Sequence, residues 1–415
     1  MRKSISSENI VVGLDIGTTK ICMAISEMTP EGKINIIGVG TCPSKGLRKG
    51  VVVNLESTVK SIEKALEDAE LMSGLGVSKV FTGIAGGHIK AINSRGVIAV
   101  SGHDKVITQA DIDRVIDAAR AVAIPLDREV IHVLTQEFIL DDQEGIKDPI
   151  GMVGVRLEAE VHIVTGAVTS AQNIIRSVNR AGLEVEDIVL EPLASSYAVL
   201  DDNEKELGVI LVDIGGGTTD IAVFSNGSIK HTSVLALGGD HVTNDIAVGL
   251  RTPNTDAEKI KKMYGCALTD LIKQDEEIEV ASVGGRAPRK ISRKILGEII
   301  EPRMEELFTL INRDIKRTGL DEIAAAGMVF TGGASLMEGT VQMAEKIFEM
   351  PVRIGYPQGV DGLTDEIRNP IYSTAIGLVL YGVKNRTLTK PGRFRGYHLF
   401  GKVSNRMKEW FGEFF

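Results

Sequence analysis

The chain has 415 residues, more than a single hydrophobic core usually organises, so we expect two or more subdomains. Hydrophobic residues make up 43% of the sequence and charged residues 25%, which is typical of globular proteins and excludes wholesale disorder. The 56 acidic residues outnumber the 47 basic ones, and the resulting net charge of −9 argues against nucleic acid as a partner.

Cysteine content and hydropathy favour a cytoplasmic protein. Cys22, Cys42 and Cys266 form neither a zinc-binding spacing nor an even disulfide framework. Residues 1–9 lack the apolar stretch of a signal peptide. Because no uncharged apolar run reaches the length of a membrane-spanning helix, we expect no spanning segment.

Two segments predict β-hairpins with glycine-rich turns. Residues 10–26 (IVVGLDIGTTKICMAIS) have the pattern of a strand, a turn and a second strand, and residues 209–224 (VILVDIGGGTTDIAVF) repeat it. In each copy an acid, Asp15 or Asp213, stands near the end of the first strand, and two threonines follow the glycines. The repetition predicts a duplicated unit whose two halves face each other.

The paired turns favour a phosphate ligand. Glycine lets backbone N–H groups approach phosphate oxygens, threonine hydroxyls add donors, and a carboxylate at each strand end can hold Mg²⁺ through water. One such turn alone is more often an ordinary tight hairpin turn, but two copies with the same acid and threonines favour phosphate binding. The sequence has no Walker P-loop and no GxGxxG turn between a strand and a helix, which excludes the P-loop and Rossmann classes.

Five segments resemble, in order along the chain, the motifs of the actin, Hsp70 and sugar-kinase superfamily. They are the two hairpins and residues 188–195 (IVLEPLAS), 328–335 (MVFTGGAS) and 373–378 (STAIGL). The segment LGGDHVTNDIA, which starts at Leu237, is more specifically similar to the FtsA family of bacterial cell-division proteins. The resemblance covers essentially the whole chain. It implies an α/β, actin-like (ribonuclease H-like) duplicated fold with four subdomains.

The resemblance also implies ATP and Mg²⁺ as cofactors. Asp15 and Asp213 match the acids that hold the hydrated metal, and Glu191 matches the position that orients water in members that hydrolyse ATP. Glu191 has a second interpretation, as an acid at a helix N-terminus before Pro192. We therefore expect ATP binding and leave open a weak ATPase activity.

Two further segments are implied to contact the nucleoside. Thr331 and the glycines after it end an apolar strand and precede a helix, so this backbone can pass close to adenosine. Residues 257–262 resemble a helix that closes over the adenine, although a solvated charged surface is the alternative. The complete set implied to bind nucleotide is Asp15, Gly17, Thr18, Thr19, Lys20, Asp213, Gly215, Gly216, Gly217, Thr218, Thr219, Gly238, Gly239, Glu258, Lys261, Lys262, Gly332, Gly333 and Ala334.

The motifs divide the chain into subdomains. About 75 residues interrupt the first half, with strands expected at 92–100 and 130–140 and a helix at 110–123 after the candidate cap Thr108. The FtsA family resembles this arrangement, with its relocated α+β subdomain at this point. The expected division is 1–85 and 161–205 (subdomain 1A), 86–160 (inserted subdomain 1C), 206–239 and 321–385 (2A), 240–320 (2B, with a loop or hairpin at 274–294), and 386–396 (linker).

Residues 397–415 predict an amphipathic C-terminal helix that binds a membrane. From Arg386 onward seven basic residues stand against two acidic ones, which favours an anionic lipid surface. A terminal helix docked on the protein body is the alternative. The apolar stripe of this helix is Leu399, Phe400, Val403, Met407, Trp410, Phe411 and Phe414.

The family resemblance implies a function in cell division. It implies a protein that polymerises on the cytoplasmic face of the cell membrane, anchors FtsZ filaments through a C-terminal FtsZ peptide bound by subdomain 2B, and recruits late division proteins at the septum. Two rivals stay open: a PilM-like adaptor of pilus assembly, which shares the fold and the insert, and an actin-fold small-molecule kinase.

Overall fold

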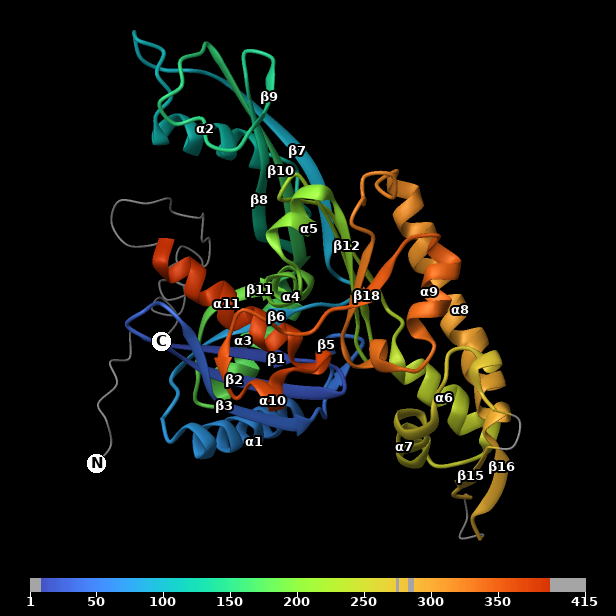
Figure 1. Ribbon diagram of the computed structural model, residues 1–415. Helices are drawn as coiled ribbons and strands as arrows, with labels where there is room; N and C mark the ends of the chain where they lie inside the picture. Colours follow the sequence, from blue (N-terminus) through green and yellow to red (C-terminus); the bar gives the residue numbers. More distant parts are fainter. Residues whose placement is uncertain (1–8, 274–275, 283–286, 389–415) are drawn as a thin grey trace.

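The computed structural model describes residues 9–273, 276–282 and 287–388 (Figure 1). Two α/β halves lie side by side, and an inserted subdomain projects from them. The linker and helix expected beyond residue 388 lie outside the described residues. Within the described part of the chain, no helix combines the length and apolar character needed to cross a membrane.

The first half is built on a six-stranded sheet in the order β11-β6-β1-β2-β3-β19. Strands β1, β2 and β3 are antiparallel, and β6 and β11 run parallel to β1. These strands are β1 (Ile10–Ile16), β2 (Lys20–Met28), β3 (Ile34–Pro43), β6 (Lys79–Ile84), β11 (Glu184–Leu190) and β19 (Asp361–Gly362). A short hairpin, β4 (Leu47–Arg48) and β5 (Val51–Val52), follows β3.

The second half repeats this topology in the order β14-β13-β12-β17-β18. Three antiparallel strands are again followed by two strands parallel to the first. The strands are β12 (Val209–Ile214), β13 (Thr219–Ser225), β14 (Ser228–Leu235), β17 (Met328–Thr331) and β18 (Val352–Ile354). The common strand order confirms the predicted duplication and the α/β class.

Helices cover the two sheets and fill the space between them (Figure 1). The first half carries α1 (Leu55–Ser73), α3 (Val168–Arg180) and α4 (Glu191–Val199), followed by the short α5 (Asp202–Leu207). The second carries α6 (Gly239–Leu250), α7 (Asn254–Tyr264), α8 (Arg293–Thr318) and α9 (Thr340–Phe348). The last two helices of the described chain are α10 (Thr364–Ile367) and α11 (Ser373–Leu388). Helix α1 begins where the Asn54 side chain accepts a hydrogen bond from the Ser57 N–H, and it ends at Gly74, whose φ of 71° only glycine adopts readily.

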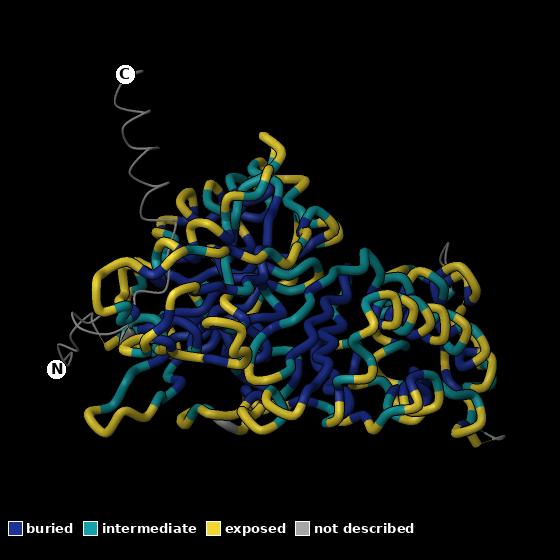
Figure 2. Tube along the Cα trace, turned by 90° about the horizontal axis from the view of Figure 1, so that it is seen from above, coloured by how far each residue is buried: buried dark blue, intermediate teal, exposed yellow. Residues whose placement is uncertain are grey.

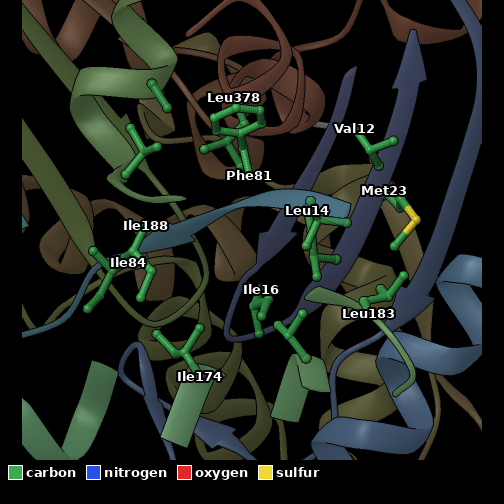
Figure 3. Packing of buried hydrophobic residues seen from close by; sticks show 14 of the residues in the cluster. Val12, Leu14, Ile16, Met23, Phe81, Ile84, Ile174, Leu183, Ile188 and Leu378 are labelled. Carbon is green, nitrogen blue, oxygen red and sulfur yellow. The ribbon is translucent and has the colours of Figure 1, made fainter. Parts of the chain in front are cut away.

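The core of the first half is packed against both faces of β1 and β6. Leu14 and Ile84 are fully buried, and Figure 3 shows them among neighbours from β2, α3, β11 and α11. Because both faces of the central strands are covered, these strands appear in the sequence as continuous apolar runs and not as alternating ones. In Figure 2 the buried trace forms a band through the middle of both halves.

The last described segments of the chain return to the first half. Strand β19 pairs with β3, and α11 packs on β1 and α4. At Gly377 the two helices approach so closely that a Cβ would overlap the Ala194 carbonyl oxygen. The range 321–385 expected for subdomain 2A therefore contains segments that contact either half. Arg386, placed in the linker by the sequence, lies in α11 and pairs with Glu186.

The inserted subdomain has its own sheet, in the order β7-β10-β8-β9, and its own core. Its elements are β7 (Lys90–Ala99), α2 (Gln109–Arg120), β8 (Arg128–Leu140), β9 (Gln143–Ile146) and β10 (Arg156–Ala167). The predicted strands and the helix after Thr108 are confirmed. The expected boundary at residue 160 falls inside β10, because that strand pairs along almost its whole length with β7 and β8.

A second predicted hairpin lies in the second half. β15 (Glu277–Val280) and β16 (Arg289–Ser292) pair antiparallel within the segment expected to be a loop or hairpin. The hairpin immediately precedes α8, the long helix that packs on α6.

Candidate functional site

The two glycine-rich turns have the same construction. In the first, the Gly17 N–H donates to the Lys20 carbonyl at 3.0 Å, and in the second the Gly215 N–H donates to the Thr218 carbonyl at 3.0 Å. Strand register places Asp213 directly opposite Asp220 in the second hairpin. Since residues opposite each other in an antiparallel pair share one face of the sheet, these two acids are neighbours.

The tips of the two turns touch. A Cβ at Gly216 would overlap Thr19, and a Cβ at Gly217 would lie 2.6 Å from the Thr18 hydroxyl oxygen. Thr18 is itself held in place, because its hydroxyl accepts the Gly50 N–H at 3.0 Å from the β4–β5 turn. The two halves therefore meet at their glycine-rich tips, and the glycines permit this approach.

Both predicted metal acids are buried beside the turns. Asp15 is 7% exposed and lies 3.6 Å from the Lys20 ammonium. Asp213 is 8% exposed and accepts hydrogen bonds from Ser195 at 2.7 Å and Thr374 at 3.4 Å. Burial raises the pKa of both carboxyls, for Asp213 to about 6, and the two hydroxyls oppose that rise by stabilising the charged form.

Two more carboxyl groups complete the acidic cluster. Glu191 is the first residue of α4 and lies over Gly83 of β6, where a Cβ would be 2.8 Å from its Cγ. Burial, and then the nearby Asp15, Asp220 and Asp213 charges, raise its pKa well above the usual range. Burial and the charge of Asp213 do the same for Asp220. One lysine, Lys20, stands among four carboxyls, so the cluster favours a bound cation.

The cluster fits a hydrated Mg²⁺ better than a directly ligated metal. Among the described residues no three His, Cys, Asp or Glu side chains converge closely enough to hold a metal ion. One Asp220 oxygen, Oδ1, is buried and accepts no hydrogen bond within the described part of the chain, although the residue is only 3% exposed. A cation carrying its own water can donate to such an oxygen across a gap that direct ligation cannot bridge.

The second turn is anchored to the start of α6. The Gly239 N–H donates to the Gly215 carbonyl at 2.9 Å, and the Asp240 N–H donates to the Gly216 carbonyl at 2.8 Å. Lys261 of α7 donates to the Gly239 carbonyl at 3.0 Å and lies 2.6 Å from Glu258. Lys262, by contrast, is mostly exposed and reaches Glu258 at 3.3 Å. Glu258 and Lys261 therefore join this region, while Lys262 lies at its rim.

The predicted nucleoside segment also reaches the site. Gly332 has φ +83°, and a Cβ there would overlap Asp213 Oδ1. Ala334 lies beside Gly239. The single 3₁₀ turn η4 (Gly333–Leu336) follows these glycines, and the expected helix is α9, which begins after Gly339. The prediction that these glycines end a strand and precede a helix is confirmed, with a 3₁₀ turn placed between them and α9.

The sequence interpretation missed three polar residues of this site. Ser195 and Thr374 lie in segments that carried the resemblance, and their hydroxyls were given no role there. Asp220 lies opposite Asp213 at the position where Cys22 lies opposite Asp15 in the first copy. This difference between the copies was the available signal. The predicted membrane residues Leu399, Phe400, Val403, Met407, Trp410, Phe411 and Phe414 lie outside the described residues.

Comparison with known sequences identifies the family. The family model "Cell division protein FtsA" matches residues 210–377, and "SHS2 domain inserted in FTSA" matches residues 86–165. The chain is 54% identical over 384 residues to the cell division protein FtsA of Pseudomonas aeruginosa, which covers 92% of each chain. It is 45% identical over 384 residues to that of Escherichia coli K12, covering 91% of each. The chain belongs to the FtsA family of cell division proteins.

Solved structures support the same fold. The chain in a PilM-PilN type IV pilus biogenesis complex aligns with a TM-score of 0.67 at 16% identity, covering 90% of this chain and 98% of that one. MreB5 of Spiroplasma citri bound to ADP aligns with a TM-score of 0.54 at 15% identity, covering 92% and 99%. These TM-scores show an actin-like fold, and the family model for the insert confirms that FtsA-type subdomain.

Proposed function

We propose that this FtsA-family chain binds ATP with Mg²⁺ between the two glycine-rich turns. The observation that carries the proposal is the contact between the two turns beside a buried, cation-deficient group of carboxyls. The MreB5 structure with ADP supports nucleotide as the ligand of this fold. When bound, Mg²⁺ would neutralise phosphate charge.

The residues around the turns have distinct proposed roles. Turn N–H groups and the hydroxyls of Thr18 and Thr218 donate to phosphate oxygens, and Lys20 balances charge. Asp15 and Asp213 hold the hydrated metal. Glu191 orients a water molecule towards the terminal phosphate. The nucleoside is bordered by Gly332, Gly333 and Ala334 and by the α7 residues Glu258, Lys261 and Lys262.

We further propose that the chain polymerises on the cytoplasmic face of the membrane and anchors FtsZ filaments at the septum. Family membership supports the cell-division role. MamK, solved as a double helical filament, has the same fold at a TM-score of 0.51 and supports self-association. In this proposal residues 397–415 attach the polymer to anionic lipid, and residues 240–320 bind the FtsZ C-terminal peptide. The polymer then recruits late division proteins to the septum.

Nucleotide titration tests the first proposal. Asp15→Asn and Asp213→Asn should each lose most of the gain in ATP affinity that Mg²⁺ provides, because each removes a charge beside the metal. Asp117→Asn is the matched control, since this exposed acid lies on α2 of the insert. Equal Mg²⁺ dependence in all four proteins would refute the proposed site.

Electron microscopy tests the second. With ATP and anionic liposomes, the full chain should form membrane-bound filaments, and a chain ending at residue 396 should leave the liposomes bare. Filaments on lipid would exclude both the pilus-adaptor and the small-molecule kinase interpretations. Lipid binding that survives the truncation would refute the proposed membrane helix.

A further inference from the structure

The inserted subdomain is seated on the outer edge of β14 by polar side chains. From β8, Gln136 donates to the Ile229 carbonyl at 2.8 Å, and from β7, Asn93 donates to the Lys230 carbonyl at 3.2 Å. From β10, His162 is 2.9 Å from the Thr232 hydroxyl, and its other ring nitrogen is 2.6 Å from Asn93. Three neighbouring strands of the insert thus contact one edge strand of the second half.

This docking surface can separate without exposing the core of the insert. The apolar core of the insert contains only its own residues. Next to the docking contacts, a cavity of about 330 Å³ lies between α2, β8 and the β13–β14 turn. A polar interface beside a cavity favours relative motion of the two bodies over rigid attachment.

At its root, the insert contacts the first glycine-rich turn. The chain leaves the first half at Gly86, which packs against Gly50, the residue whose N–H binds the Thr18 hydroxyl. Arg128 fastens the same root by donating to the His88 carbonyl at 2.8 Å. The insert is therefore attached near the tip of the first hairpin.

At its side, the insert contacts β14, the neighbour of the strand that follows the second turn. Strand β13 begins directly after that turn and pairs along β14, which carries the docking carbonyls. If the two halves part, the insert must either leave β14 or bend at its root. The root combines the covalent chain and the Arg128 contacts with the apolar side chains of Ile89, Ile131 and Val164, which are buried in the core of the first half. The contacts with β14 are mostly hydrogen bonds, with Leu134 packed beside them, so the docking surface is the part that separates first.

We propose that the inserted subdomain is a strap that seats on β14 when nucleotide closes the two glycine-rich turns and leaves β14 when they part. This inference rests on the nucleotide binding proposed above. By linkage, a strap that favours the closed state also raises the affinity for nucleotide.

Distance measurements between spin labels test the strap. One label is attached to the cysteine of Val153→Cys, a site that is 68% exposed near the far end of the insert. The other is attached to the cysteine of Lys346→Cys, at an exposed position on α9 of the second half. Cys42→Ser removes the native thiol that is not buried. Adding ATP and Mg²⁺ should narrow the distance distribution in the parent chain and leave it broad in His162→Ala.

Binding of a fluorescent ATP analogue provides the second measurement. His162→Ala, and Thr232→Val from the opposite side of the same contact, should each weaken binding about fivefold or more, and the double variant should be no worse than either. Arg95→Ala, whose ion pairs with Glu158 and Glu160 stay within the insert, should bind like the parent.

Each contrary result has a defined meaning. A parent chain that binds nucleotide with an unchanged distance distribution overturns the strap alone. The same holds if His162→Ala and Thr232→Val both bind as well as Arg95→Ala. A parent chain that binds no nucleotide overturns the strap together with the proposed function.

Discussion

Thr19 in the first turn lies against Gly216 in the second, with no room for a side chain between them. A methyl group in Gly216→Ala should therefore hold the two tips apart. ATP binding should weaken at least about tenfold, because the N–H and hydroxyl donors of both tips could no longer reach the phosphate oxygens together. Isothermal titration measures the effect. Gly87→Ala, where a Cβ meets only open space, should bind normally. Unchanged affinity in Gly216→Ala would show that the tips need not close.

Replacement of Glu191 by glutamine separates its two interpretations. If the carboxylate orients the attacking water, Glu191→Gln should lower the hydrolysis rate about 100-fold and leave ATP affinity nearly unchanged. If it acts only as an acid at the start of α4, the rate should stay and the free energy of unfolding should fall by about 0.3–1 kcal/mol. Phosphate release and urea unfolding measured on the same preparations distinguish these outcomes.

His162 should make folding stability depend on pH. Burial, and then the nearby His231 and His132, lower its pKa from 6.5 to about 4, so the folded chain keeps this ring neutral while the unfolded chain protonates it. The contribution of neutral His162 to the free energy of unfolding is fully present above pH 6.5 and is lost as the pH falls towards 4. Between these two pH values the free energy of unfolding should fall by about 3 kcal/mol.

The parent and His162→Gln should therefore differ in pH profile. Urea unfolding between pH 7.5 and 4 should give a parent curve that falls more steeply than the variant curve. Parallel curves would contradict the buried neutral state of His162.

Gly377 allows α11 to lie against α4, because a Cβ there would overlap the Ala194 carbonyl oxygen. Gly377→Ala should lower the free energy of unfolding by about 1–3 kcal/mol, as other overpacked sites do. Gly76→Ala is the control, since its nearest neighbour would be the Glu70 carboxylate at 3.9 Å, and it should change stability by less than about 0.5 kcal/mol. Equal unfolding midpoints for the two variants would argue against close helix packing at this position.

Local pattern was sufficient to predict much of the fold. The two hairpins, helix α1 and the elements of the insert each have a run, a spacing or a cap that marks them within a short stretch of sequence. The 3₁₀ turn η4 was not distinguished from the helix that follows it, because a 3₁₀ turn and the start of an α-helix have similar local signals. The end of the insert was also uncertain, since strand pairing and not composition determines how far β10 extends.

Some residues of the candidate site could also be predicted from local pattern, and others could not. Repetition of an acid, glycines and two threonines was enough to single out Asp15 and Asp213, because those residue types have their chemistry wherever the chain places them. Asp220 lies beside Asp213 through the register of a single hairpin. The contacts of the Ser195 and Thr374 hydroxyls with Asp213, and the contacts of the insert with β14, depend on which distant segments meet. Those contacts are determined by strand register and by the packing of the two halves. The spacing of residues along the chain does not determine either of these.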